Sequence, residues 1–402
     1  MPIKKAQLAF LTSTHTVNDL YQGAVPALLP YLMVQRGYSY TAISGIALAV
    51  TGLSTAFQPL FGLLADRRPR GWLVPVGFLT AGAGVSAVGL VHGYVLTWLC
   101  VALAGVGLAA FHPPATSEAR VAAGRSQKGM SVFSVGGTFG ASLAPALVTV
   151  VVGSMGLSGT PLLIMPAVVM AVLWVLRRLR SRRTETAAAA GVQAVVAHVP
   201  DEWRSFGRLV AVVVGWSVPY VSITALVSLH AQRTLHAGSG AGAAVLTSFT
   251  AAGAVGTLAG GWVADRWGRL RAVRAGYLLG ILALAGVLWS PSFAVLEVCT
   301  LLCGVTMFLP FAPQVTLAQD YLPNRPGTAS GLTLGLAMSV GGLTSPLFGV
   351  LADAQGLRAV FAAALAVFVL AACLAFRLPD RRPVAESAAA EPADGEPART
   401  GA

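Results

Sequence analysis

The sequence is poor in charged residues. Only 10% of its 402 residues are Asp, Glu, Lys or Arg, whereas a soluble domain carries about 25%. Together with a hydrophobic content of 55%, this scarcity excludes an ordinary cytosolic enzyme, a disordered chain and a nucleic-acid-binding module. The net charge of +12 does not change this conclusion, because the basic residues stand in short clusters between apolar runs, where they set membrane topology.

Cysteines and catalytic motifs are also scarce. The four cysteines all lie within apolar stretches, which is not the pattern of a secreted disulfide framework. The chain has no Gly-x4-Gly-Lys-Ser/Thr loop for nucleotide phosphates and no His-Glu-x-x-His metal motif. We therefore expect no enzyme activity, no cofactor and no metal site, and we expect a proton gradient to supply the energy.

Long apolar runs dominate the chain. Because a membrane-spanning helix needs about 20 apolar residues, the runs predict an all-α membrane protein with twelve transmembrane helices in two six-helix, pseudo-symmetric halves. The predicted spans are 8–33, 41–65, 72–92, 94–118, 129–153 and 160–178, followed by 208–231, 241–264, 271–290, 293–319, 328–351 and 357–377.

The positions of the basic residues predict the orientation. With the N-terminus inside, 24 of the 27 Lys and Arg residues fall on the cytoplasmic side, as the positive-inside rule requires. Both termini are then cytoplasmic. The predicted domains are an N-terminal half (1–178), a charged and Ala-rich cytoplasmic linker (179–207), a C-terminal half (208–377) and a disordered cytoplasmic tail (378–402).

The two halves repeat each other at a fixed offset of 199 residues. Gly62-Leu-Leu-Ala-Asp66-Arg67 matches Gly261-Trp-Val-Ala-Asp265-Arg266, and Pro114 matches Pro313. Matches at one offset and at the same topological place indicate duplication. Parallel six-helix repeats with a substrate site between them are the plan of one large transporter fold.

The segment Gly261-x-x-Ala-Asp265-Arg266-x-Gly268-Arg269 resembles a loop motif of the major facilitator superfamily. This resemblance implies a cytoplasmic gate that biases one of two conformations, formed by Asp66, Arg67, Asp265, Arg266 and Arg269. Asp66 and Asp265 can face a helix N-terminus or pair with arginine. The alternative is that these charges only set the topology.

A narrower resemblance is to the fosmidomycin-resistance group of bacterial efflux transporters. It is carried by His15-x-x-Asn18-Asp19-x-x-Gln22, by Phe111-His112-Pro113 and by Ala318-Gln319-Asp320-Tyr-Leu-Pro323-x-Arg325. The resemblance implies efflux across a bacterial cytoplasmic membrane. The group commonly has an acidic residue directly after His-Pro and a basic residue three positions later, where this chain has Pro114 and Ser117.

The first predicted helix carries the clearest functional pattern. At 3.6 residues per turn, His15, Asn18, Asp19 and Gln22 lie on one stripe about 100° wide. A charged side chain at bilayer depth costs several kcal/mol and needs a cavity and a partner. Asp19 is therefore the candidate proton carrier, assisted by His15. The alternative is a buried pair that only locks helices together.

Other polar and aromatic residues are predicted to line a central substrate cavity. We expect Pro113 and Pro114 to break the fourth helix beside His112, since each proline removes a backbone donor. The alternative for His112 is a bond to a free carbonyl at the helix end, and for Trp216 and Tyr220 it is core packing. The predicted cavity residues are Asn18, Gln22, His112, Trp216, Tyr220 and Gln314.

These observations favour a monomeric, proton-coupled exporter of small drug-like or polar compounds. Its partners are a small-molecule substrate, protons and the lipid bilayer, with no nucleic acid. An importer or metabolite permease on the same fold remains an alternative, because helix periodicity does not separate export from import. A membrane receptor that transports nothing is a more distant alternative.

Overall fold

The computed structural model describes residues 3–38, 40–67, 71–124, 126–185, 199–237 and 239–381, and in these ranges the protein is helical with no β-strand. A first group of helices comprises α1 (Lys5–Arg36), α2 (Tyr40–Arg67), α3 (Leu73–Ala87), α4 (Tyr94–Ala123), α5 (Gln127–Met155), the 3-10 helix η1 (Gly156–Ile164) and α6 (Met165–Glu185). A second group comprises α7 (Trp203–Thr234), α8 (Ser239–Trp267), α9 (Arg269–Leu288), α10 (Phe293–Phe308), α11 (Phe311–Tyr321), α12 (Pro326–Gln355) and α13 (Leu357–Phe376).

Every apolar run predicted from the sequence lies on one or two of these helices. Within the described ranges, eight helical stretches are long and apolar enough to cross a membrane, so the protein is a multi-pass membrane protein. The eight do not include α1, which carries the polar stripe of His15 and Asp19, or α3, which has only 15 residues.

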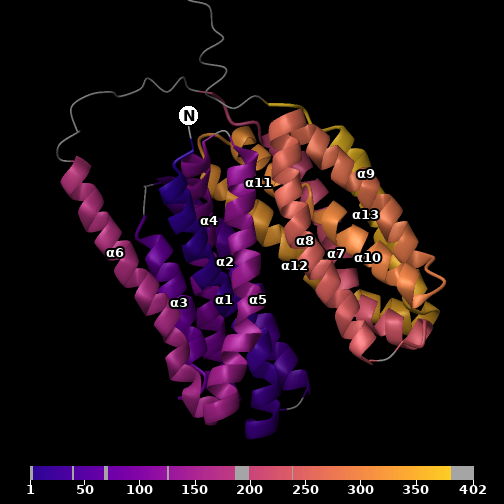
Figure 1. The fold of residues 1–402 in the computed structure, drawn as a ribbon, viewed down its shortest axis with the longest axis horizontal. Helices are drawn as coiled ribbons and strands as arrows, with labels where there is room; N and C mark the ends of the chain where they lie inside the picture. Colours follow the sequence, from indigo (N-terminus) through magenta and orange to yellow (C-terminus); the bar gives the residue numbers. More distant parts are fainter. Residues whose placement is uncertain are drawn as a thin grey trace, which may run out of the picture.

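The two groups of helices have separate hydrophobic cores. One core is built from residues of α1–α6 with Ala312 added, and the other from residues of α7–α13. The groups converge at the end of the molecule that carries the N-terminus and diverge toward the opposite end (Figure 1). We call the convergent end the terminal end. Along the seam between the groups, α2 packs against α12 and α5 packs against α8.

The predicted break beside His112 is wrong, because α4 runs through Pro113 and Pro114 without interruption. All residues from Leu108 to Thr116 are buried among neighbouring helices. A proline is tolerated inside a membrane helix because neighbouring helices and hydroxyl side chains can satisfy the backbone groups that it frees. The interruption lies instead in the second group, where α10 ends at Phe308 and α11 begins at Phe311, with Pro310 between them.

The linker and the tail are shorter than predicted where the structure describes them. Helix α6 continues to Glu185 and α7 begins at Trp203, while 186–198 lies outside the described residues. Leu378 is buried, and Arg381 donates a hydrogen bond to the carbonyl oxygen of Tyr321 at 2.9 Å. Residues 378–381 therefore pack against the terminal end, and the rest of the predicted tail, 382–402, lies outside the described residues.

Small-residue motifs on α5 and α8 pack within each group rather than between the groups. A Cβ atom on Gly136 or Gly140 would meet α1 at Thr12 or Thr16, and one on Gly256 or Gly260 would meet α10. The close approach of α8 to α5 occurs instead at Gly261, whose Cβ would meet Ser131 and the backbone of Gln127. The paired glycines therefore let helices of one group approach closely.

Gly140→Ala is expected to destabilise the protein. The added methyl group would collide with the backbone of Thr16, which cannot move aside without shifting α1. Overpacking of this kind costs about 1–3 kcal/mol, and thermal unfolding of the detergent-purified protein should show a lower midpoint. Gly207→Ala is the matched control, since nothing lies within 4 Å of its Cβ position. An equal midpoint for the two variants would contradict the assigned packing.

Candidate functional site

His15 and Asp19 lie one turn apart on α1 and contact each other. The Nε2 atom of His15 is 3.2 Å from Oδ2 of Asp19. On the other side of the imidazole, Nδ1 is 2.8 Å from the carbonyl oxygen of Phe133 on α5. A carbonyl oxygen can only accept, so this bond places a hydrogen on Nδ1 and turns Nε2 toward the carboxyl group. The ring of Phe133 stacks on the imidazole at 4.4 Å and holds its orientation.

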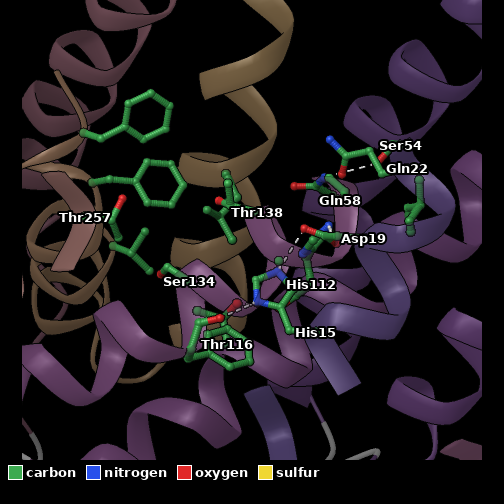
Figure 2. Close-up of a pocket in the computed structure, with 18 of the residues that line it drawn as sticks. His15, Asp19, Gln22, Ser54, Gln58, His112, Thr116, Ser134, Thr138 and Thr257 are labelled. Carbon is green, nitrogen blue, oxygen red and sulfur yellow. Dashed lines mark hydrogen bonds and ion pairs between the residues drawn. The ribbon is translucent and has the colours of Figure 1, made fainter. Parts of the chain in front are cut away.

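His112 completes the cluster from α4. Its Nε2 atom lies 3.5 Å from Oδ1 of Asp19, and the same oxygen accepts a hydrogen bond from Asn18 Nδ2 at 2.9 Å. Figure 2 shows His15, Asp19 and His112 directed toward one another. We call these three side chains the Asp19 cluster. The sequence predicted the pair on α1, and the structure adds a third ionisable group from another helix.

The geometry of the Asp19 cluster requires a proton. A neutral His15 with its hydrogen on Nδ1 has an acceptor at Nε2, and an ionised Asp19 also offers only acceptors. Two acceptors 3.2 Å apart do not attract each other, so the contact forms when a proton sits on Nε2 or on the carboxyl group. This pair therefore holds a proton in the observed geometry.

The same three groups could in principle hold a metal ion, because their ligand atoms lie within 4.8 Å of one another. However, both carboxylate oxygens of Asp19 already have partners. Oδ1 accepts from Asn18, and Oδ2 faces His15. A metal ion and the proton exclude each other at the Asp19 cluster, because Nε2 of His15 must be free of hydrogen to act as a ligand.

The Asp19 cluster lines a cavity of about 340 Å³ between the two groups of helices. The volume falls within the range of small-molecule sites. The first group contributes mostly polar side chains and the second mostly apolar ones. Of the predicted residues, those that line the cavity are His15, Asp19, Gln22, His112 and Tyr220.

Three predicted cavity residues lie elsewhere. Asn18 is fully buried behind Asp19, and Gln314 is buried with its Nε2 atom donating to the hydroxyl of Tyr277 at 2.9 Å. Trp216 donates from Nε1 to the carbonyl oxygen of Met307 at 2.7 Å. That carbonyl stands next to the interruption between α10 and α11, where the helical ladder does not supply its usual donor. The core-packing alternative therefore holds for Trp216.

Several polar residues of the cavity wall were not predicted from the sequence. On α2, Gln58 donates from Nε2 to Ser54 Oγ at 3.2 Å, while its Oε1 atom is buried and has no hydrogen-bond partner in the part of the chain that the structure describes. The one available indication was that Ser54 and Gln58 stand four residues apart on one face of a predicted membrane helix. The other polar lining residues not predicted are Thr51, Thr55, Thr116, Ser134, Thr138, Ser142, Thr250 and Thr257.

Two carboxylates at the terminal end cap helices of the opposite group. Asp66, at the end of α2, accepts hydrogen bonds at 2.7 Å from the backbone N–H groups of both Gly327 and Thr328, in the first turn of α12. Asp265, at the end of α8, accepts from the backbone N–H of Gln127 at 2.6 Å and of Lys128 at 3.0 Å, in the first turn of α5. Negative charge is favoured at these helix ends. The two repeats thus cap each other reciprocally.

A buried ion network lies between the caps. Asp320 on α11 pairs with Arg269 on α9 and, at 3.3 Å, with Arg120 on α4 of the other group. Of the predicted gate residues, Asp66 and Asp265 therefore bond to helices of the opposite group, and Arg269 pairs with Asp320 within its own group. Arg67 and Arg266 are exposed and make no ion pair with any residue that the structure describes.

Comparisons with known proteins agree with this architecture. A family model described as Major Facilitator Superfamily matches residues 11–346. An uncharacterized MFS-type transporter, YfnC, from Bacillus subtilis (strain 168) is 30% identical over 380 residues, which is 92% of each chain. The fosmidomycin resistance protein of Escherichia coli (strain K12) is 27% identical over 379 residues, or 93% of each chain.

Solved structures share the fold at low sequence identity. The transporter FucP in the outward conformation has a TM-score of 0.74 at 15% identity, over 93% of this chain and 99% of its own. A bacterial homologue of the iron transporter ferroportin in an outward-facing state has a TM-score of 0.71 at 16% identity, over 95% of this chain and all of its own. The chain is thus a transporter, not an enzyme, and it belongs to the Major Facilitator Superfamily.

Proposed function

We propose that this protein is a proton-coupled secondary transporter that exports small drug-like or polar compounds by alternating access. It spans a bacterial cytoplasmic membrane twelve times as two six-helix halves, with both termini in the cytoplasm, and it acts as a monomer. The observation that carries the proposal is the cavity between the two groups of helices, into which the Asp19 cluster opens.

Proton coupling is supported by the composition of the cavity wall. Apart from the phenol of Tyr220, the described lining residues contain three ionisable groups, namely His15, Asp19 and His112. The Asp19 cluster needs a proton for its own contacts, and it lies in the cavity where substrate would bind. Protons and substrate therefore compete for one site. Such competition is sufficient to couple their movements in opposite directions, because each ligand favours a different state.

The conformation supports alternating access. The caps of Asp66 and Asp265 and the pair of Arg120 with Asp320 all join the two groups at the terminal end. If the termini are cytoplasmic, as 24 of the 27 basic residues favour, this end is the closed cytoplasmic side. The cavity then communicates with the outside, and the inward-open state requires these contacts to break.

Export is supported by the relative from Escherichia coli, whose name is fosmidomycin resistance protein. Cells that express this chain should accumulate less of a transported compound than cells that express Asp19→Asn, and a protonophore should remove the difference. A panel of amines, alcohols and phosphonates gives the compounds to test. Higher accumulation in the wild-type cells would indicate import instead and would overturn the proposed direction.

Transport is expected not to depend on a metal ion. Because a proton shared with His15 completes the contact of Asp19 without a metal ion, treatment of membrane vesicles with EDTA should leave the transport rate unchanged. A rate that falls in EDTA and returns with added Zn²⁺ would show that the Asp19 cluster holds a metal ion.

A further inference from the structure

The two walls of the cavity differ in chemistry. On the side of the first group, polar side chains surround Asp19, whereas Tyr220, Phe308 and Phe311 stand on the side of the second group. Figure 2 shows Asp19, His15 and Gln58 on one side and Thr257 across from them. A compound that spans this cavity therefore meets hydrogen-bonding groups at one end and aromatic rings at the other.

The aromatic wall forms one connected cluster. Tyr220 stacks on Trp216 at 4.9 Å between ring centroids, and Phe308 stands edge-on to Tyr220 at 5.8 Å. Phe311 lies 6.1 Å from Phe308. The bond from Trp216 to the carbonyl of Met307 ties this cluster to the interruption after α10. The faces of such rings carry partial negative charge and attract cations.

The polar wall offers acceptors without a fixed positive charge. No Lys or Arg lines the cavity among the residues that the structure describes. The Oε1 atom of Gln58 is buried and has no hydrogen-bond partner among the residues that the structure describes. A buried acceptor without a partner is costly, and a ligand N–H group would satisfy it once the amide turns toward the cavity that Gln58 lines.

Helix α4 contributes no Lys or Arg to the lining of the cavity among the residues that the structure describes. The hydroxyl of Ser117 donates to the carbonyl oxygen of Pro113 at 3.0 Å. Arg120, one turn further along α4, is paired with Asp320. A phosphonate would therefore meet the carboxyl group of Asp19 and two histidines that already face it, with no permanent cation to neutralise its charge.

We propose, building on the proposed transport function, that the substrates are aromatic amines that are protonated at neutral pH. The aryl body packs against Tyr220, Phe308 and Phe311. The ammonium group donates hydrogen bonds toward Asp19 and the free oxygen of Gln58. Phosphonates are excluded, although a relative of this chain is named for resistance to one. The cavity of about 340 Å³ limits these amines to small molecules.

Binding of three compounds that share one aryl body tests the inference without a gradient. We would titrate phenylbutylamine, phenylbutanol and phenylbutylphosphonate into the purified full-length protein by calorimetry. The amine should bind at least about tenfold more tightly than the phosphonate, with the alcohol between them. Equal or tighter binding of the phosphonate overturns the inference, and so does the absence of binding by all three.

Substitutions in each wall test whether the aromatic rings and the polar side chains both contribute to amine binding. Phe308→Leu keeps an apolar side chain but removes the ring face, and it should weaken amine binding about two- to fivefold more than alcohol binding. Gln58→Leu should also lower the preference for the amine. Phe139→Leu, on the exposed face of α5, is the control that should change nothing. Since calorimetry needs no proton gradient, a failure of proton coupling would leave this order of affinities intact.

Discussion

Asp19→Asn is expected to reduce gradient-driven transport to the level of vesicles without the protein, while exchange of substrate in the absence of a gradient persists. Asparagine is close to aspartate in size and can still accept the hydrogen bond from Asn18, so the packing of α1 is kept. The variant loses the one carboxyl group among the described lining residues of the cavity. A site that cannot exchange a proton can bind substrate, but it cannot couple substrate movement to the gradient.

Proteoliposomes separate the two activities. Accumulation against a concentration gradient should disappear in Asp19→Asn, and counterflow of labelled substrate should remain. Asp380→Asn, in an exposed loop, should behave as wild type. Uphill accumulation by Asp19→Asn would assign the proton to another group and leave the contact with His15 as a structural lock.

Asp320→Asn is expected to open the terminal end. Asp320 is only 7% exposed and pairs with both Arg269 and Arg120. Removing one member of a buried ion pair costs about 3–5 kcal/mol, because the partner charges stay buried without compensation. Here Arg120 and Arg269 would be left facing each other across the seam between the halves. Under the proposed orientation, the closed terminal end depends on this network, so the population of the outward-open state should fall.

Distances between spin labels measure this change. Labels at Val121→Cys on α4 and Trp267→Cys on α8 are exposed near the terminal end and belong to different groups. In a background without native cysteines, Asp320→Asn should add a population at longer distance. Asp380→Asn is the control, because Asp380 also lies near the terminal end but is exposed. An unchanged distribution in Asp320→Asn would contradict the gate.

The helical periodicity of the sequence predicted contacts between residues of the same helix. His15 and Asp19 are one turn apart, so their contact follows from the helical repeat alone. For Asp66 and Asp265, the sequence offered either a helix N-terminus or an arginine as partner, and the structure shows helix N-termini of the opposite group. His112 could not be joined to Asp19 in this way, since the two lie on different helices and meet only through the packing of α1 against α4.

Errors arose where tertiary packing overrides a local rule. Proline disfavours a helix interior in water, yet Pro113 and Pro114 lie inside α4, where the surrounding helices exclude water. Polarity alone also placed Trp216 and Gln314 in the cavity wall. Their side chains bond instead to other protein groups and do not line the cavity. A polar side chain in a membrane helix shows that a partner exists, and only the structure shows which partner.

Proton release from everted membrane vesicles tests the central claim most directly. With an acid-inside gradient imposed, a panel of cationic drugs and phosphonates is added while the lumenal pH is followed. We predict that a transported compound releases protons from wild-type vesicles and releases none from Asp19→Asn vesicles. Equal release from both, or no release alongside measurable uptake of the compound, would contradict proton-coupled export through Asp19.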